Sequence, residues 1–331
     1  MEPRFDFGIN GSRILETYYN ENLQPVRVPA DCVLDLNTLR PFYRRLFRPV
    51  ENFLAEVDER GETSFYIHRT FALGDMLMLV PVVRYLRTLG YDPRIRTTEL
   101  FREILTYLGI LVEIADRPHL EGFGISLDGV IERDHWDRSL SYFHRVHIYL
   151  KALGVKEMPE KVDWSCDLSQ LPRVNVGDEP YVAFQDSGST PIKRLQSETV
   201  KYIYEGFKRE GVKVISISDT IGKHLPSALH LFALIAKAKC LISMDSAPLW
   251  ISHFTKTPVV CIFGPTRPKE RLTLHSLYPE GVVGVELSKE IECKPCFEHA
   301  EKCDRRIDCL KVKPERIYEL LKPLVMQFWR S

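Results

Sequence analysis

Residues 64–91 read SFYIHRTFALGDMLMLVPVVRYLRTLGY and hold the pattern that decides the fold. Ser64–Arg69 is a short run rich in apolar residues, which predicts a buried strand. Asp75–Leu89 carries apolar residues on most of its turns, which predicts a helix. Gly74 lies between them and permits a tight turn. A strand followed directly by a helix is the repeating unit of a parallel sheet covered by helices.

The same alternation continues on both sides of a linker, Asp167–Pro180, which has little periodicity. Before the linker we predict strands at Arg94–Thr98, Val112–Ala115 and Ile125–Ile131 and helices at Glu99–Leu108 and Arg138–Leu153. After it we predict strands at Tyr181–Gln185, Val212–Ser216, Cys240–Ser243, Val259–Phe263 and Val282–Glu286, and helices at Ser197–Glu210, Leu229–Ala238, Ala247–Phe254 and Pro314–Phe328. The fold class is therefore α/β, with two similar halves.

The length of 331 residues also predicts about two domains. We expect a small extension at residues 1–60, with short strands and one helix. An N-terminal α/β domain follows at 61–170, and a C-terminal α/β domain with a cysteine cluster and a terminal helix occupies 171–331.

The overall composition excludes several classes of protein. Lys plus Arg and Asp plus Glu are 45 each, and this zero net charge argues against a nucleic-acid binder driven by bulk charge. The 44% hydrophobic content is wrong for a disordered chain. The start, MEPRFDFGIN, lacks the apolar run of a signal peptide, and no run approaches the roughly 18 apolar residues of a membrane span. We expect a cytoplasmic protein.

The first candidate site is Gly74-Asp75, between a strand and a helix. In one interpretation Asp75 is only the residue that caps the helix. In the other it is a functional carboxylate at the carboxyl end of a parallel strand, where ligand crevices form in α/β sheets. The two interpretations are compatible.

The second candidate is the loop DSGSTPIKR at 186–194, which follows a predicted strand. Small hydroxyl residues, a glycine and two cations suit a phosphate site. The loop lacks the spacing of a P-loop, and a solvated polar loop is an equal alternative. Its candidate ligand-binding residues are Ser187, Ser189, Thr190 and Lys193.

Further candidates follow later strands of the second half. Asp245, Ser246 and Ala247 open a predicted helix, whose first amides would suit an anionic pyrophosphate, although simple capping explains them equally well. Arg267 adds a cation after the next strand, and the alternative interpretation of this segment is a plain connecting loop. Asp219 follows strand Val212–Ser216 and is a candidate acceptor from a nucleoside ribose.

These segments together resemble glycosyltransferase family 9, the heptosyltransferase-like group. The resemblance rests on ALGDMLMLVPVVRYLRTLGY (72–91), SGSTPIKR (187–194), MDSAPLWISHFTKTPVVCIFGPT (244–266) and the late cysteines, and covers about residues 64–325. It implies two Rossmann-like domains that face each other across a cleft, the GT-B arrangement. It also implies an inverting transfer from a nucleotide-diphosphate sugar such as ADP-heptose, without a catalytic metal.

The resemblance further implies roles for single residues. Asp75 falls on the general base, Lys193 on the lysine that contacts the donor phosphates, and the Asp245-Ser246 pair on the start of the nucleotide-binding helix. Such a base would take the acceptor proton while the hydroxyl attacks the anomeric carbon. The chain departs from the family pattern at Ala247, where glycine is usual, and at Trp250, where histidine is usual. These departures keep open a non-catalytic nucleotide- or sugar-binding protein on the same fold.

Four cysteines lie close together near the end of the chain: Cys293, Cys296, Cys303 and Cys309. Four thiolates can complete a closed tetrahedral site for structural Zn or Fe, which would brace a loop and not take part in chemistry. Reduced cysteines and local disulfides are the alternatives, and a metal-thiolate regulatory protein is a third hypothesis for function.

The sequence does not identify the acceptor, and the candidates are a glycan, a lipopolysaccharide-core or other lipid-linked sugar, and a protein hydroxyl. Arginines of the extension offer a contact to an anionic acceptor or to a membrane surface, against the alternative of a solvated basic face. They are Arg40, Arg44, Arg45 and Arg48.

Overall fold

The computed structural model of the chain describes two strands of the extension and most of the rest of the chain. The strands are β1 (Leu15–Tyr19) and β2 (Pro25–Pro29), which pair antiparallel. The other described residues are 53–69, 72–114, 123–127, 144–188, 193–220, 227–272, 281–291 and 308–331.

The first half is built on a four-stranded parallel sheet in the order β5-β4-β3-β6. Its strands are β3 (Ser64–His68), β4 (Asp92–Thr97), β5 (Val112–Ile114) and β6 (Gly124–Ser126). Its helices are α2 (Phe53–Glu59), α3 (Leu73–Thr88), α4 (Arg102–Tyr107) and α6 (Arg145–Ala152).

The second half is built on a five-stranded parallel sheet in the order β11-β10-β9-β7-β8. Its strands are β7 (Val182–Gln185), β8 (Val214–Ser216), β9 (Cys240–Met244), β10 (Val259–Phe263) and β11 (Val282–Glu286). Its helices are α7 (Ser197–Arg209), α8 (Ile217–Thr220), α9 (Ala228–Lys237), α10 (Ala247–Thr255), α11 (Lys269–Leu272) and α12 (Pro314–Arg330). Every residue of β9 and β10 is buried, as expected for central parallel strands.

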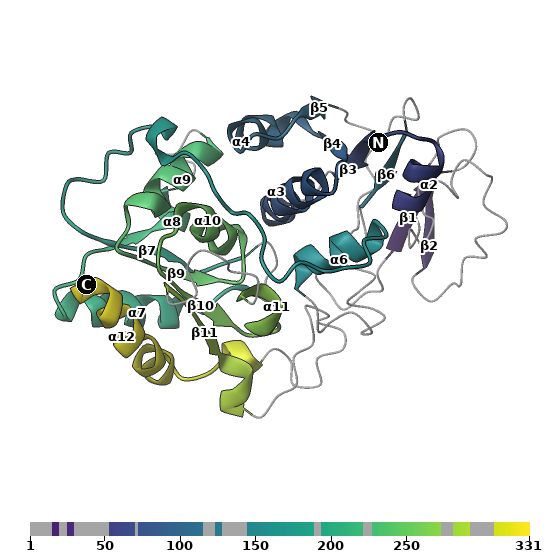
Figure 1. Ribbon diagram of the computed structural model, residues 1–331. Helices are drawn as coiled ribbons and strands as arrows, with labels where there is room; N and C mark the ends of the chain where they lie inside the picture. The colour runs from purple at the N-terminus through teal and green to yellow at the C-terminus, as the bar shows by residue number, and fades with distance from the viewer. Residues whose placement is uncertain are drawn as a thin grey trace.

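The two halves pack directly on each other through their helices (Figure 1). Helix α3 contacts α10, and α4 contacts α9. Consecutive residues of α3 from Asp75 to Val83 are buried, because the sheet, α6 and α10 surround the helix. One hydrophobic cluster therefore runs through both halves and includes Met76 from α3 and Phe254 from α10. A second cluster fills the space between the second sheet, α7 and α12.

The structure shortens several predicted elements. The predicted helix Arg138–Leu153 is helical from Arg145, and its residues 138–143 lie outside the described part of the chain. The predicted strand Ile125–Ile131 is described only as Gly124–Ser126. The segment predicted as the linker begins with a short 3-10 helix, Leu168–Gln170. Between Asp163 and Asp167 the chain is held to the first half, because Arg84 donates to Ser165 O at 2.7 Å and Tyr107 to Asp167 O at 2.6 Å.

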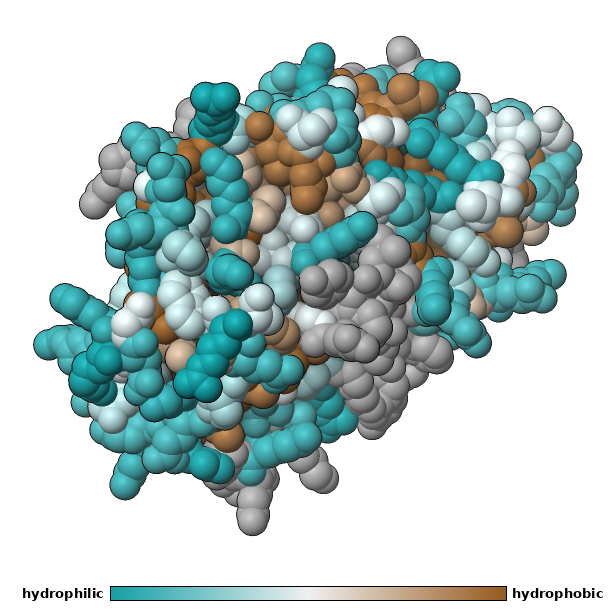
Figure 2. All heavy atoms as spheres, turned by 60° about the vertical axis from the view of Figure 1, so that its left-hand side comes forward, coloured by the Kyte–Doolittle hydropathy of each residue, from teal (hydrophilic) through white to brown (hydrophobic). Residues whose placement is uncertain are grey.

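The surface is mostly hydrophilic in the view of Figure 2, with apolar side chains gathered toward the top of the molecule. Exposed leucines include Leu100 and Leu111, which precede α4 and β5. Among the described helices, none has the length and apolar character that a bilayer crossing requires.

Candidate active site between the two sheets

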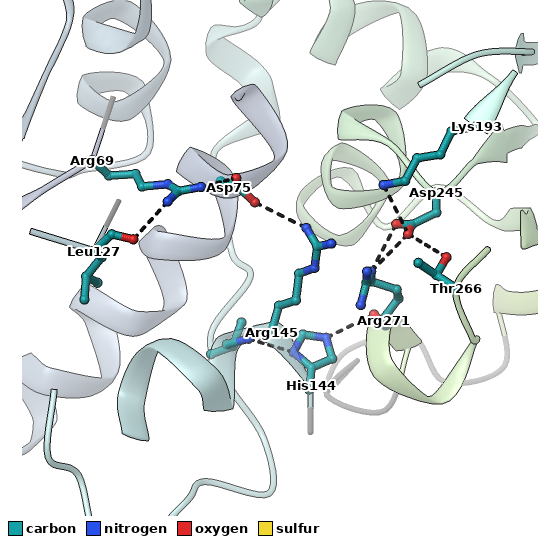
Figure 3. Close-up of polar contacts among 10 residues, drawn as sticks. Arg69, Asp75, Leu127, His144, Arg145, Lys193, Asp245, Thr266 and Arg271 are labelled. Carbon is teal, nitrogen blue, oxygen red and sulfur yellow. Dashed lines mark hydrogen bonds and ion pairs between the residues drawn. The ribbon is translucent and has the colours of Figure 1, made fainter. Parts of the chain in front are cut away.

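Asp75 lies in the first turn of α3, at the carboxyl end of β3, and its side chain faces two guanidinium groups (Figure 3). Its Oδ2 accepts from Nη2 of Arg69 at 2.5 Å, and its Oδ1 lies 3.4 Å from Nη1 of Arg145. Arg69 also donates to the carbonyl oxygen of Leu127 at 2.9 Å. The helix begins after Ala72, so the prediction that Asp75 caps the helix is wrong, and its carboxylate is used for ion pairing instead.

The turn that leads into α3 is strained. Ala72 has φ 54° and ψ 126°, a region that residues with a Cβ rarely adopt. Strain of this kind costs on the order of 1–3 kcal/mol and is retained where the surrounding structure imposes it. It lies three residues before Asp75 and so marks this turn as a candidate functional segment.

Gly74 lies where α3 packs against the start of α10. A Cβ added there would lie 3.1 Å from Cδ1 of Trp250 and 3.7 Å from Cα of Ala247. The predicted ligand-binding glycine therefore touches the helix start that was predicted to bind the donor. Trp250 is only 2% exposed and stacks on Trp164 with ring centres 6.0 Å apart.

Asp245 is buried at the end of β9 and is surrounded by polar partners (Figure 3). Thr266 donates to Oδ2 at 2.8 Å, and Nε of Arg271 lies 3.1 Å from the same oxygen. Nζ of Lys193 is 3.5 Å from it. Burial alone would raise the pKa of Asp245, but the cations Arg271, Lys193 and Arg145 together with the Thr266 hydroxyl hold that pKa well below its usual range. Asp245 is therefore an ionised centre that organises the loops around it.

Lys193, which contacts Asp245, comes from the loop after β7. Gly188 N donates to Lys193 O at 2.8 Å, and Leu195 N donates to Asp186 O at 2.9 Å, so the two ends of the loop are bonded to each other. A Cβ at Gly188 would lie 2.8 Å from Cβ of Lys193, which explains the glycine. Lys193, predicted to contact donor phosphates, is buried and contacts Asp245.

Ser246 precedes the first residue of α10, but its hydroxyl donates to Met244 O at 3.3 Å. Among the described residues, its side chain makes no capping hydrogen bond to α10. The start of α10 nevertheless offers few amides to an anion, because Pro248 has no N–H and the N–H of Leu249 donates to Ser246 O at 3.1 Å.

A cavity of about 560 Å³ opens at the carboxyl ends of β7 and β8. Its lining includes two predicted binding residues, Ser187 and Asp219, together with Asp186, Arg194 and Tyr204. Ser218 donates to Oδ1 of Asp186 at 2.7 Å. The cavity offers carboxylates, hydroxyls, cations and one aromatic ring, a set of groups that suits a polar ligand carrying a flat ring.

The remaining predicted site residues fall into two groups. Arg267 is half-buried in the segment after β10. Ser189, Thr190, Cys293, Cys296 and Cys303 lie outside the described residues. Cys309 is described and buried, and its Sγ would lie 3.3 Å from a Cβ added at Gly264, at the end of β10. No metal-binding group of three His, Cys, Asp or Glu residues occurs within the part of the chain that the structure describes.

Four residues of the site were not predicted: Arg69, His144, Arg145 and Arg271. All are at most 8% exposed. Of the four, Arg69 had the clearest sequence signal for a place in the site, because it ends the predicted strand that comes before the Gly74-Asp75 turn. The other three are recognised only once the fold brings α6 and α11 to the carboxyl ends of both sheets.

Two parallel sheets whose helices α3 and α10 meet at the strand ends define the GT-B class of glycosyltransferase fold. Residues 227–305 match the family model described as glycosyltransferase family 9 (heptosyltransferase). This match supports the family resemblance predicted from the sequence. A search among curated proteins returned no match to the sequence.

Solved structures agree with this class. The chain is similar to the iron-containing dodecameric glycosyltransferase TibC from enterotoxigenic E. coli H10407, at 16% identity and TM-score 0.56, covering 80% of this chain and 77% of TibC. It is similar to the E. coli heptosyltransferase WaaC with ADP, at 13% identity and TM-score 0.51, covering 78% of this chain and 99% of WaaC. A family 9 glycosyl transferase from Veillonella parvula DSM 2008 gives 14% identity and TM-score 0.50, with 80% and 97% covered. At these identities the likeness establishes the fold.

Proposed function

We propose that the chain is an inverting glycosyltransferase that moves a sugar from a nucleotide-diphosphate donor to a hydroxyl group. The donor that we favour is ADP-heptose. The observation that carries the proposal is the meeting of the Gly74-Asp75 turn with the Ser246-Ala247 helix start, at the facing strand ends of two parallel sheets. The family match over residues 227–305 supports it. So do the structures of TibC with ADP-D-β-D-heptose and of WaaC with ADP.

In this proposal the first half of the chain supplies the general base, and the second half stabilises the leaving diphosphate. Asp75 would take the proton of the acceptor hydroxyl, because inversion needs a base on the side of the attacking oxygen. A carboxylate oxygen has two lone pairs, so Oδ1 can accept this proton while it faces Arg145. The N–H of Ala247 at the start of α10 and the cations beside Asp245 would stabilise the charge that grows on the leaving diphosphate.

The nucleoside would occupy the cavity at the carboxyl ends of β7 and β8. Asp219 follows the second strand of this half, where an acidic residue accepts from ribose hydroxyls in many Rossmann-like sheets. Ser187 also lines this cavity and belongs to the loop that carries Lys193. This arrangement would place the diphosphate between the cavity and α10.

We also propose a structural metal at the four late cysteines, Zn or Fe, as TibC is iron-containing. Cys309 lies against Gly264 at the end of β10, so a metal there would brace the turn that carries Thr266 and Arg267. Metal analysis of protein purified without added metal should find about one equivalent per chain, and the Cys309→Ser variant should contain clearly less. Equal metal content in both proteins would contradict the assignment.

A second candidate is a non-catalytic protein that binds a nucleotide or a sugar on the same fold. The observation in its favour is that Trp250, at the position where the family usually has histidine, is buried and contacts Gly74. Such a protein would bind ADP or a nucleotide sugar without turnover.

The test is to measure ADP release and product formation from ADP-heptose with glycan, lipopolysaccharide-core and protein acceptors. We expect wild-type turnover, and in Asp75→Asn a loss of at least about 100-fold with ADP binding retained. Binding without turnover in the wild type would favour the second candidate. The absence of both binding and turnover with ADP- and UDP-sugars would contradict both.

A further inference from the structure

A buried histidine, His144, joins the two halves of the molecule. His144 immediately precedes α6, is 2% exposed, and lies between Arg145 and the C-terminal half in Figure 3. Its Nδ1 accepts from the backbone N–H of Val146 at 3.1 Å. The proton must therefore sit on Nε2, which lies 3.0 Å from the carbonyl oxygen of Arg271 and donates to it. One ring thus caps a helix of the first half and bonds the backbone of the second.

The two neighbours of this ring reach the two carboxylates of the site. Arg145, the next residue, points its guanidinium at Asp75. Arg271, whose carbonyl accepts from His144, points its own side chain at Asp245. A continuous set of contacts therefore runs from Asp75 through Arg145, His144 and Arg271 to Asp245.

The surroundings hold the imidazole in place and keep it neutral. The imidazole and the Trp250 ring form a T-shaped pair, with their planes at 90° and their centres 5.6 Å apart. Burial lowers the pKa of His144 well below its ordinary value, against the opposing effect of the hydrogen bond to the Arg271 carbonyl. The charges of His253, Arg271 and His147 lower the pKa further. A neutral ring can cap with Nδ1 and donate with Nε2 at the same time, which the protonated ring cannot do.

We propose that His144 is a positioning residue of the transferase site, which sets Arg145 against Asp75 by fixing the start of α6 to the backbone of Arg271. The proposal rests on the function proposed above. Its mechanism is orientation: errors of about 1 Å in the placement of reacting groups cost up to roughly 100-fold in rate. His144 touches neither reacting atom and is not a catalytic residue.

The test uses His144→Asn, because an asparagine oxygen can still cap α6 but is too short to reach Arg271 as well. The matched control is His147→Asn. His147 lies on the same helix, and its Nε2 bonds Pro159 O at 2.8 Å, away from Asp75. A merely structural role predicts similar effects of the two variants on turnover for a similar loss of thermal stability.

The first measurement does not depend on activity. Long-range ¹H–¹⁵N correlation of the imidazole nitrogens at pH 7 should show His144 with its proton on Nε2, and this signal should vanish in His144→Asn. A proton on Nδ1 overturns the proposal.

The second measurement is a double-mutant cycle on melting temperature with Asp75→Asn. We expect the losses from His144→Asn and Asp75→Asn to be less than additive, because the first change already weakens the Arg145 contact that the second removes. The same cycle with His147→Asn should be additive. Additive losses with His144→Asn overturn the proposal, whether or not the protein transfers a sugar.

The third measurement is turnover with ADP-heptose. We expect His144→Asn to lower kcat by about 10- to 100-fold with less than about threefold change in the donor KM, and His147→Asn to stay near the wild type. Equal kcat in the two variants overturns the proposal. A wild type without turnover would contradict the proposed function. The tautomer of His144 and the double-mutant cycle would still test the positioning role of His144.

Discussion

Asp245, which the sequence predicts to bind a ligand, is also a buried residue that holds several polar side chains together. A carboxylate this deeply buried is tolerated only because Thr266, Arg271 and Lys193 surround it. The sequence marked Asp245 as a site residue by its place between a strand and a helix. It did not reveal the partners, because Arg271 lies 26 residues away and arginine is usually exposed.

Replacing Asp245 with Asn should destabilise the protein strongly. The change leaves Arg271 and Lys193 buried beside a neutral group, which costs about 3–5 kcal/mol when one member of a buried ion pair is removed. Urea unfolding measures this loss. Thr266→Val, which removes one hydrogen bond to the same carboxylate, is the control and should cost only about 1 kcal/mol. If Asp245→Asn and Thr266→Val lowered the free energy of unfolding by similar amounts, the ion pairs of Asp245 with Arg271 and Lys193 would not be the main source of its contribution to stability.

Tyr204, in the wall of the cavity, gives a prediction about alkaline stability. Burial raises the pKa of Tyr204 to about 12. A group whose pKa is raised in the folded state contributes stability below its unfolded pKa of about 10 that is lost as pH rises toward 12. Tyr204→Phe should therefore lose less stability than the wild type between pH 10 and 12, measured by urea unfolding at each pH. Parallel curves for the two proteins would contradict the assignment.

At the scale of elements, the approach of α3 to α10 sets the geometry of the site. Gly74→Ala should destabilise the protein by about 1–3 kcal/mol, because the new methyl group meets the Trp250 ring at 3.1 Å. In an exposed helix the same change would stabilise, so the sign of the effect is informative. Thermal unfolding measures it.

The suppressor for this variant is Trp250→Phe. The smaller ring should make room for the methyl group, so the cost of Gly74→Ala should be smaller in the Trp250→Phe background. An unchanged cost would mean that the contact between these two residues does not limit the approach of the helices.

Most elements could be predicted because their apolar residues follow a clear period. Helix α10 was predicted as Ala247–Phe254 and is Ala247–Thr255, and α12 was predicted as Pro314–Phe328 and is Pro314–Arg330. The start of α6 was missed because its cap is the ring of His144, and histidine is not a typical capping residue. The turn at Ala72 was missed because only tertiary structure imposes its backbone angles on an alanine.

At the scale of the whole molecule, a single cluster of apolar side chains spans both halves. We therefore predict one cooperative unfolding transition, with calorimetric and van't Hoff enthalpies in agreement. Probes of each half, such as near-ultraviolet circular dichroism and hydrogen exchange of β3 and β9, should report the same midpoint. Two separated transitions would show that the contacts of α3 with α10 and of α4 with α9 are too weak to couple the halves.

The stacked indoles of Trp164 and Trp250 give this junction an optical signature. Their planes lie 19° apart with centres 6.0 Å apart. Aromatic chromophores at this distance couple their electronic transitions, so the pair should produce an exciton signal in circular dichroism that neither ring produces alone. Trp164 comes from the segment that joins the halves and Trp250 from α10, and any opening between them would extinguish the signal. Loss of this signal in solution would therefore report, without a label, that Trp164 has separated from α10.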